Sequence, residues 1–515
     1  MRPARARMVS RATAVVIMAA AAIACGHGRP ASFGPAKVDI PVSDGKRPRP
    51  VSAEGSSRQS APPSGAAKES RFPHVTYLKL ANGMGVDVVT SRALPIVQMR
   101  VLVRAGASDA SAGVAVLTGD MLKDGGTRAM TSADLARRIE TLGADLSVDT
   151  DLDGTVLSMA VTRDQAAEGL SLLAQIVREP RFDDGELRKT KARAVDAAES
   201  ALRSSGQFTA TRLLFRELYP AKSAYATYGA VPSEINRIDA GAVRDLHRRF
   251  YVPKATTLVL AGDIDEATAK SLAEKAFGSW TGGDPPKTEH APPRLSKTRV
   301  LVAHRPKSAQ SDVYVAVIAP PRKAAEWANV RVAVQVLGGG PASRLYADVR
   351  EQRSLAYRVG AQVQDLAHGE QPLFLYAGTA TPKTALAVTG LLENLARLTS
   401  SPPTSSETEN ARRFISDVFA IRMETIGSIA DLVVTQEQLG LGEGYWDTYR
   451  RDVRATDAAA AETAARKLVG RGDTLVVVAG DADIIGPELA KIGEVTVVDP
   501  EKEFTTMRTI PQEAR

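Results

Sequence analysis

The sequence predicts an α+β protein in which helices cover one face of a sheet, and it predicts this unit twice. Three observations support the prediction. Short runs of β-forming residues are followed by long alanine-rich helical runs. A strand-like segment ending in Gly-Asp occurs at two distant places, and a segment rich in proline and glycine separates them. With 515 residues, of which 44% are hydrophobic and 24% charged, the chain is long enough for at least two domains.

The N-terminus has the pattern of an export signal. Four arginines precede an apolar run of 13 residues at 12–24, which is too short to span a bilayer. The run ends in Ala22-Ile-Ala-Cys25-Gly26, which resembles a bacterial lipobox with alanine in place of the usual leucine. We therefore expect residues 1–25 to be a lipoprotein signal peptide that ends at the lipidation site, Cys25. The alternative is an ordinary secretory signal in which the cysteine occurs by chance.

The residue after the cysteine bears on location. Gly26, rather than Asp, favours the outer membrane in a Gram-negative cell. The expected location is therefore the bacterial cell envelope, with a lipid anchor on the periplasmic face of the outer membrane.

Composition argues against several kinds of site. Cys25 is the only cysteine, so the chain forms neither an internal disulfide nor a thiolate metal site. The formal net charge is +7, but four basic residues lie in the expected signal peptide. Without them, 62 basic residues face 59 acidic ones, a net charge of +3. This balance gives no support for nucleic-acid binding.

The expected domain boundaries follow changes in composition. Residues 26–72 are rich in Pro, Ser, Gly and Ala without sustained apolar periodicity, which predicts a disordered tether. Residues 281–294 contain four prolines, which interrupt both helices and central strands, and this predicts a linker. We therefore expect domains at 73–280 and 295–500 and a C-terminal tail at 501–515.

Hydrophobic periodicity predicts the elements of the first domain in order. An Asn-Gly pair predicts a hairpin between the first two strands. A Thr-Ser start and a glycine end delimit the second helix. The expected strands are at 75–80, 86–90, 97–103, 145–149 and 155–161, and the expected helices are at 113–124, 132–142, 163–178 and 183–203.

The strongest internal signal is a repeat. Residues 257–265 read Thr-Leu-Val-Leu-Ala-Gly-Asp-Ile-Asp, and residues 474–483 read Thr-Leu-Val-Val-Val-Ala-Gly-Asp-Ala-Asp. The two Gly-Asp pairs begin at Gly262 and Gly480, which are 218 residues apart, too far for a solenoid repeat. We interpret this as one domain present twice.

Several short motifs occur in a specific order: Leu80-Ala-Asn-Gly-Met84, Arg104-Ala-Gly-Ala-Ser-Asp109, Phe250-Tyr-Val-Pro253 and the repeated Gly-Asp. Together they resemble the pitrilysin/insulinase-type zinc peptidases, or inverzincins, which include mitochondrial processing peptidase. The resemblance covers nearly everything from about residue 75 to 500. It implies two homologous domains, each a mainly antiparallel sheet with helices packed on one face.

The metal-binding helix of that family is degenerate here. The segment 113–127 is laid out like the family's His-x-x-Glu-His helix. Val116 stands at the first His, Gly119 at the Glu and Asp120 at the second His. These positions share one helix face, but valine has no lone pair and glycine supplies no general base. One carboxylate remains where catalytic zinc has three protein ligands, so we expect no metal in this chain.

The other candidate ligands are weak. No two of the six histidines have the spacing of a shared helical site. The family takes a further Glu from a later helix, where this chain has Asp196 and Glu199. Asp120 with either acid is a possible site for a hard ion such as calcium, but a solvated helix face is the interpretation we favour.

The second domain retains a motif that the first has lost. Gly338, Gly339 and Gly340, followed by proline, predict a helix start, with the helix running to about residue 353 and a strand at 355–363. The glycines resemble a substrate-binding loop in the non-catalytic subunit of mitochondrial processing peptidase. The resemblance implies that Arg350 and Tyr357 bind the substrate backbone and support the tetrahedral oxyanion. Guanidinium and phenol both donate hydrogen bonds to such an oxygen.

Ordinary alternatives exist for each of these features. They are a helix-entry turn for the glycines, a hydrated helix end for the arginine and a surface position for the tyrosine.

Together, the motifs predict the non-zinc subunit of a heterodimeric pitrilysin-type metallopeptidase. The chain is expected to be inactive alone, to bind peptide substrate and to supply the Arg/Tyr pair to a homologous partner subunit that carries the zinc. The alternative is a catalytically inert peptide-binding or assembly scaffold of the envelope. Hydrolysis through an unrecognised metal site is a third and weaker possibility, because Gly119 leaves no general base.

Overall fold

The structure, a computed structural model, describes residues 70–295, 298–470 and 472–513. The predicted signal peptide with Cys25, and the predicted tether up to residue 69, lie outside the described residues. Within the described part, every helix is too short or too polar to cross a membrane.

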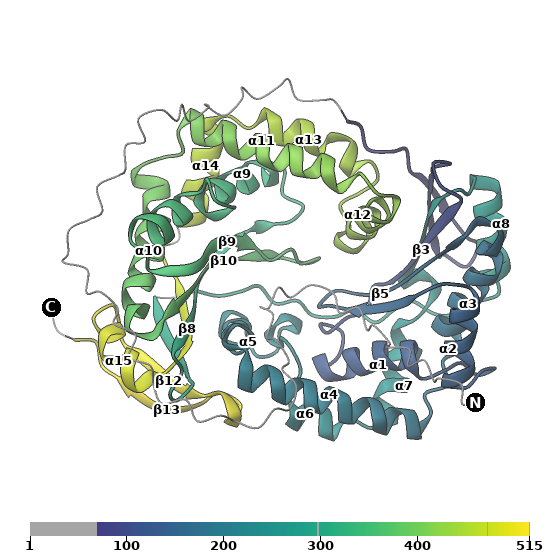
Figure 1. The fold of residues 1–515 in the computed structure, drawn as a ribbon, viewed down its shortest axis with the longest axis horizontal. Helices are drawn as coiled ribbons and strands as arrows, with labels where there is room; N and C mark the ends of the chain where they lie inside the picture. The colour runs from purple at the N-terminus through teal and green to yellow at the C-terminus, as the bar shows by residue number, and fades with distance from the viewer. Residues whose placement is uncertain (1–69, 296–297, 471, 514–515) are drawn as a thin grey trace, which may run out of the picture. The chain divides into compact units, whose positions relative to one another are not determined.

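The first half of the chain contains a six-stranded sheet with the order β1-β2-β6-β3-β5-β4. Strands β3 and β5 of this sheet are labelled in Figure 1. Its strands are β1 (Thr76–Lys79), β2 (Gly85–Thr90), β3 (Ile96–Val103), β4 (Leu146–Thr150), β5 (Thr155–Thr162) and β6 (Thr256–Gly262). All neighbours are antiparallel except the pair β2 and β6. The five strands predicted from periodicity are therefore present within two residues of their expected bounds.

The second half contains a seven-stranded sheet with the order β13-β12-β7-β11-β8-β10-β9. Its strands are β7 (Arg299–His304), β8 (Gln310–Pro321), β9 (Ala356–Val363), β10 (Glu370–Ala380), β11 (Leu475–Gly480), β12 (Val495–Asp499) and β13 (Thr505–Ile510). Strand β7 is parallel to β11 and β12, and the other pairs are antiparallel. The expected tail at 501–515 thus includes an edge strand, β13.

The two sheets repeat one topology, as the repeated Gly-Asp segment predicts. Strand β6 lies between parallel β2 and antiparallel β3, and β11 lies in the same way between β7 and β8. The order β2-β6-β3-β5-β4 in the first sheet corresponds to β7-β11-β8-β10-β9 in the second. By this correspondence, the helix that follows β3 is equivalent to the helix that follows β8.

Most of the helices begin where a polar side chain caps them. Asp239 and Asp457 each accept a hydrogen bond from a backbone N–H in the first turn of the helix that follows. The first-half helices are α1 (Ala112–Asp124), α2 (Ser132–Thr141), α3 (Ala166–Arg178), α4 (Asp184–Ser204), α5 (Gly206–Leu218), α6 (Pro232–Arg237), α7 (Ala240–Phe250) and α8 (Glu266–Phe277). The second-half helices are α9 (Trp327–Gly338), α10 (Thr384–Ser400), α11 (Ser405–Arg422), α12 (Ile426–Leu439), α13 (Tyr445–Ala455), α14 (Ala458–Val469) and α15 (Ala482–Ala490).

Short helical segments complete the fold. A π-helix, η4, spans Tyr346–Gln352. The 3₁₀ segments are η1 (Arg163–Gln165), η2 (Ala224–Ala226), η3 (Pro253–Ala255), η5 (Thr381–Lys383) and η6 (Pro500–Lys502). Residues 281–295 form neither helix nor strand, as expected for a linker.

Each sheet also packs against a helix from the other half. Helix α12 of the second half lies on β3 and β6, where Ile429 and Val433 join Leu102 and Val259 in one buried cluster. Helix α5 of the first half lies on β8 and β11. Both halves belong to one compact unit, Ala67–Arg515, so the exchange of α5 and α12 between the halves takes place within one packed body.

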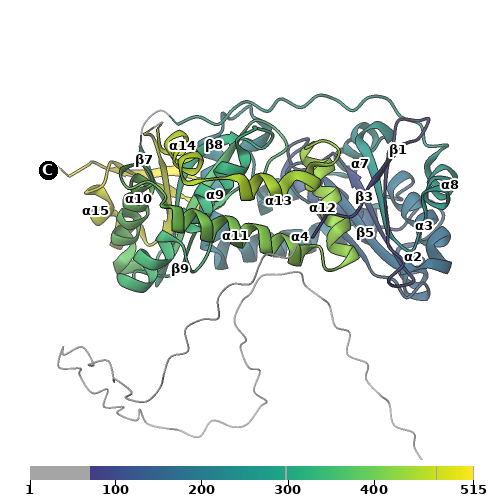
Figure 2. The ribbon, with the colours of Figure 1, turned by 90° about the horizontal axis from the view of Figure 1, so that it is seen from above.

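The folded region begins earlier than the expected residue 73. The Phe72 ring lies 6.4 Å from the rings of both Phe419 and Trp446, measured between centroids. The Ser70 backbone carbonyl accepts a hydrogen bond from Arg450 at 2.7 Å. These contacts attach the start of the described chain to α11 and α13, which lie side by side in both ribbon views (Figures 1 and 2).

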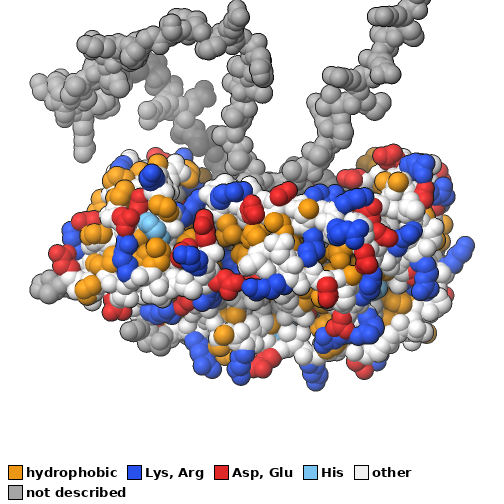
Figure 3. All heavy atoms as spheres, turned by 90° about the horizontal axis from the view of Figure 1, so that it is seen from below, with side chains coloured by type: hydrophobic (Ala, Val, Ile, Leu, Met, Phe, Trp, Pro, Cys, Tyr) orange, Lys and Arg blue, Asp and Glu red, His pale blue; other side chains and the backbone are white. Residues whose placement is uncertain are grey.

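Charged side chains of both signs are mixed over the face drawn in Figure 3. No large area of one sign is visible on that face. This distribution agrees with the near-balanced charge of the chain and differs from the basic surface typical of nucleic-acid binding.

Candidate functional site

Helix α1 carries the three degenerate motif positions. It begins after the N-cap Ser111, whose hydroxyl accepts from the Val114 N–H, and it packs against β4, α4 and α7. Val116 is 37% exposed and lines a cavity of about 330 Å³, together with Thr150, Phe208 and Tyr228 among others. An apolar side chain therefore faces the cavity where the motif would place its first ligand.

Gly119 lets α1 approach β4 closely. A Cβ atom at this position would lie 2.5 Å from Thr150 Oγ1 and 3.5 Å from Val148 Cγ1. The first distance is shorter than a van der Waals contact, so any side chain at 119 requires Thr150 to move. The position where the motif has its general base is thus filled by a neighbouring side chain.

Asp120 is largely buried, and burial raises the pKa of its carboxyl. Asp124 adds to this increase, while Arg193 opposes it. Asp196 is exposed, and Glu199 forms an ion pair with a residue of its own helix. In the part of the chain that the structure describes, acids and histidines form some groups of three or more that are close enough to hold a metal ion. None of Asp120, Asp196 and Glu199 belongs to such a group. A calcium site formed by Asp120 with one of the other two acids stays a prediction.

The glycine triplet ends a helix, so the expectation that it begins one is wrong. Helix α9 ends at Gly338, Gly339 is its C-cap, and the next helical residue is Arg344. A Cβ on Gly338 would lie only 2.3 Å from the Ala361 backbone nitrogen. Glycine is required here because α9 crosses directly over β9.

Arg350 lies on the π-helix η4 and remains 43% exposed at its side chain. Its guanidinium carbon stands 4.7 Å from the centroid of the Tyr346 ring, and its Nε is 3.9 Å from Glu351 Oε1. The segment is anchored by buried Asp348, which accepts hydrogen bonds from Arg353 and Asn394. π-Helical turns occur frequently at functional sites, so this geometry favours a role for the arginine.

Tyr357 is the extra residue of a β-bulge in β9. Arg358 pairs with Gly378 and Ala356 pairs with Thr379, so Tyr357 has no partner of its own in the ladder. The side chain is 56% exposed and lies over Gly378, where a Cβ would come within 2.9 Å of the phenol ring. Its hydroxyl makes one long contact, 3.5 Å to Gln310 Oε1. The phenol donor therefore lies at the surface, engaged only in this long hydrogen bond.

The structure places Arg350 and Tyr357 on consecutive elements that pack together, η4 and β9. Their side chains have separate partners among the described residues, and no contact joins them.

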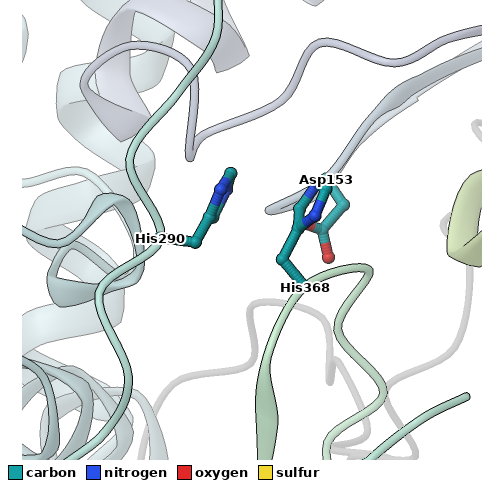
Figure 4. A group of neighbouring side chains, drawn as sticks. All are labelled: Asp153, His290 and His368. Atoms are coloured by element: carbon teal, nitrogen blue, oxygen red, sulfur yellow. The ribbon is translucent and has the colours of Figure 1, made fainter.

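A cluster that sequence spacing does not predict joins three distant segments (Figure 4). Asp153 lies in the turn between β4 and β5, His290 in the linker and His368 in the turn between β9 and β10. Their candidate ligand atoms all lie within 4.8 Å of one another. Each histidine is isolated in sequence, so only tertiary folding brings the group together.

Burial shifts the pKa of each of the three side chains. Burial lowers the pKa of His290 to about 4 and also lowers the pKa of His368, so both rings are neutral at pH 7. Burial raises the pKa of Asp153 to about 6, although Tyr225 and the Ala367 N–H donate hydrogen bonds to it and oppose the increase. At neutral pH the cluster contains two neutral imidazoles and a carboxylate.

Two family models match this chain. One, described as Insulinase (Peptidase family M16), matches residues 88–223, and the other, described as Peptidase M16 inactive domain, matches residues 237–415. The chain belongs to peptidase family M16. The pitrilysin/insulinase resemblance and the two-domain α+β fold are thereby confirmed.

M16 relatives of this chain carry different names. A protein named an uncharacterized zinc protease, from Mycobacterium leprae, is 25% identical over 406 residues, which are 76% of this chain and 88% of the relative. A protein named a non-peptidase homolog, from Helicobacter pylori, is 25% identical over 340 residues, or 64% and 75% of the two chains. The solved structure of a peptidase M16 inactive domain from Pseudomonas fluorescens has a TM-score of 0.73 at 24% identity, covering 79% of this chain and 98% of that chain.

M16 membership alone does not decide activity, because these relatives include proteins named as proteases and one named as a non-peptidase. The residues of α1 and of the η4–β9 region are therefore the features from which function is inferred.

Proposed function

We propose that this chain is the non-zinc subunit of a heterodimeric M16 metallopeptidase. It binds a peptide and supplies Arg350 and Tyr357 to a homologous partner whose His-x-x-Glu-His helix holds the zinc. The observation that carries the proposal is the state of α1. Val116 offers no ligand, and the space that a side chain at Gly119 would need is filled by Thr150.

The retained surface supports a role in substrate binding. Strand β4 is the edge strand of the first sheet, and the cavity lined by Val116 and Thr150 lies beside it. An extended peptide can add to such an edge through main-chain hydrogen bonds while its side chains enter neighbouring pockets. The peptide is then held without any metal ligand from this chain.

The Arg/Tyr pair supplies the chemical contribution. Both side chains are exposed donors, and their own partners are weak: an aromatic ring, a carboxylate 3.9 Å away and an amide oxygen 3.5 Å away. Each is therefore free to donate to a carbonyl oxygen as negative charge develops on it. A well-placed donor of this kind contributes roughly 3 kcal/mol to transition-state stabilisation.

The test is reconstitution with an M16 chain from the same organism that carries an intact His-x-x-Glu-His helix. Hydrolysis of an internally quenched peptide is measured for this chain alone, for the partner alone and for the mixture. We expect no hydrolysis by this chain alone and activation of the partner by its addition. Arg350→Ala and Tyr357→Phe should each lower kcat/KM of the mixture by about ten- to several-hundred-fold.

Matched controls separate this role from general damage. Arg451→Ala removes an exposed arginine of α13, and Tyr449→Phe removes a hydroxyl from a half-buried tyrosine of the same helix. Neither should change turnover. Equal turnover in wild type and in both Arg350→Ala and Tyr357→Phe would rule out the donor role, and hydrolysis by this chain alone would rule out the non-catalytic role.

The second candidate is an inert scaffold of the envelope that binds peptides or assembles other proteins. The degenerate α1 fits it equally well, and one relative is named a non-peptidase homolog. The same reconstitution distinguishes the two, because a scaffold leaves the partner's turnover unchanged.

We also propose that Cys25 anchors the chain to the membrane through lipid. Cys25→Ser should move the protein from the membrane fraction to the soluble fraction of the native cell. Retention of the variant in the membrane would refute the anchor.

A further inference from the structure

Three segments that are far apart in sequence converge on one group of donors. The turn after β4 contributes Asp153, the linker contributes His290 and the turn after β9 contributes His368 (Figure 4). We propose that these three side chains bind a divalent transition-metal ion of the zinc type, which ties the two halves of the chain and their linker together. The three side chains are not those of the α1 motif, although Asp153 and Val116 line one cavity, and the proposal does not depend on the proposed peptidase role.

The donor set fits such an ion. Two imidazoles and one carboxylate are ligands that zinc and neighbouring divalent metals accept, and three protein ligands leave a fourth position for water. The fourth position would face a cavity of about 420 Å³ that both histidines and Asp153 line. The cluster therefore has the ligand number of a site that is open on one side.

The separations require only small side-chain movements. Zinc bonds of about 2.0–2.1 Å in a tetrahedron place the donor atoms about 3.3 Å apart. The candidate atoms lie within 4.8 Å of one another, and the two histidine rings are stacked with centroids 4.2 Å apart. The His290 ring is half-buried, with a 3.4 Å contact to the Ser108 hydroxyl and a hydrogen bond to the Thr288 backbone, so it exchanges these contacts when its nitrogens turn inward. The His368 ring is exposed.

The carboxylate is already oriented by groups outside the donor set. The buried Tyr225 hydroxyl donates to Asp153 Oδ1 at 2.5 Å, and the Ala367 N–H donates to Oδ2 at 2.8 Å. The Tyr225 hydroxyl also accepts a hydrogen bond from the backbone N–H of His368 at 3.2 Å, so the Tyr225 side chain connects two of the three segments. Each carboxylate oxygen keeps a lone pair for a metal, and metal ligands are typically fixed by such outer contacts.

The charges around the cluster are mixed. Asp109 and Asp151 lie close enough to Asp153 for their charges to act on it. Lys323 acts on His368 with the opposite sign. The cavity beside the cluster is lined by Asp109 and Glu437 and also by Arg104, Lys287 and Lys323, so the donor set itself, two imidazoles and a carboxylate, carries the proposal.

A second grouping of possible ligands is occupied by structural contacts. Asp481 caps α15 and accepts from the Lys307 N–H at 2.7 Å, and His304 Nδ1 accepts from the Ala482 N–H at 3.1 Å. The third member, Asp483, is ion-paired with Arg508. This grouping provides a matched control for the proposed site.

The experiment uses the full chain without a polyhistidine tag, stripped of metal by a chelator and then dialysed. Zinc is titrated in competition with a chromophoric chelator, and cobalt(II) is titrated separately to record the visible absorption of a tetrahedral site. We expect saturation at one equivalent. His290→Ala and His368→Ala should each weaken zinc binding by at least about 100-fold and abolish the cobalt band. His304→Ala and His74→Ala should leave both unchanged.

A second measurement tests whether the metal holds the three segments together, through thermal stability and protease resistance. Zinc should raise the Tm of the wild type and slow proteolysis within residues 281–295, and it should do neither for His290→Ala. The metal-free Tm of each variant checks its folding, and His290→Gln and His368→Gln replace any alanine variant that fails this check. Absence of saturation at one equivalent, or binding that survives both histidine substitutions, would overturn the proposal.

Discussion

Asp87 lies in the middle of β2 and is almost completely buried beneath α12. Burial raises the pKa of its carboxyl from 3.8 to about 8. Repulsion from Glu437 and Glu443 adds to this increase, and Arg104 opposes it. In the described structure its Oδ2 atom has no hydrogen-bond partner, in keeping with a carboxyl that is protonated at neutral pH.

The direction of the pH effect follows from this shift. Below about pH 4 the carboxyl is protonated in both folded and unfolded states, so it costs nothing. Between pH 4 and pH 8 the unfolded chain releases the proton while the folded chain retains it, so the free energy of unfolding falls as pH rises. At pH 7 the loss is roughly 4 kcal/mol, because about three pH units have been crossed at 1.36 kcal/mol each.

Asp87→Asn keeps the shape of the protonated side chain and removes the titration. We expect the variant to lose this downward slope between pH 4 and pH 8, and to be more stable than the wild type at pH 7 by up to that amount. Urea unfolding at several pH values measures the difference, with Asp149→Asn, at an exposed position of β4, as the control. Parallel pH profiles for Asp87→Asn and the wild type would refute the reasoning.

Three further predictions concern packing. Gly119→Ala should destabilise the fold by about 1–3 kcal/mol, because the new Cβ overlaps Thr150 even though alanine has the better helix propensity. Adding Thr150→Ala should recover most of that loss. Urea unfolding of the single and double variants checks this, and a gain in stability from Gly119→Ala alone would contradict it. Gly338→Ala should lower the free energy of unfolding by more, about 3 kcal/mol or beyond, because the new Cβ meets the backbone nitrogen of Ala361, which cannot rotate away. A smaller loss than for Gly119→Ala would contradict the close crossing of α9 over β9. Phe72→Ala should lower the Tm by several degrees because its ring packs against α11 and α13, and an unchanged Tm would place Phe72 in the tether as the sequence suggested.

Local patterns predict the first domain well, because its elements carry their own signals. The strands alternate or are continuously apolar, and α2 has both a capping box at Thr131 and a glycine after its end. The repeated Gly-Asp segment predicts the duplication because Gly262 and Gly480 occupy equivalent strand ends. These are short-range or internally repeated features.

The errors come from contacts that a single segment does not encode. A run of glycines followed by proline suits a helix start. In the structure, however, position 338 requires glycine because α9 crosses closely over β9. Strand β13 is almost entirely exposed, so its sequence lacks the apolar alternation that marks a half-buried strand. His290 and His368 meet only after both halves have folded, and no local spacing announces their proximity to Asp153.

The exchange of α5 and α12 between the halves has a consequence for what happens if the backbone is cut. A protease that nicks residues 281–295 would leave α5 seated on the second sheet and α12 seated on the first. The nicked protein should stay associated and migrate as one particle in gel filtration. Produced separately, each fragment would expose the sheet surface that the missing helix covers, and mixing the two fragments should restore the fold by complementation.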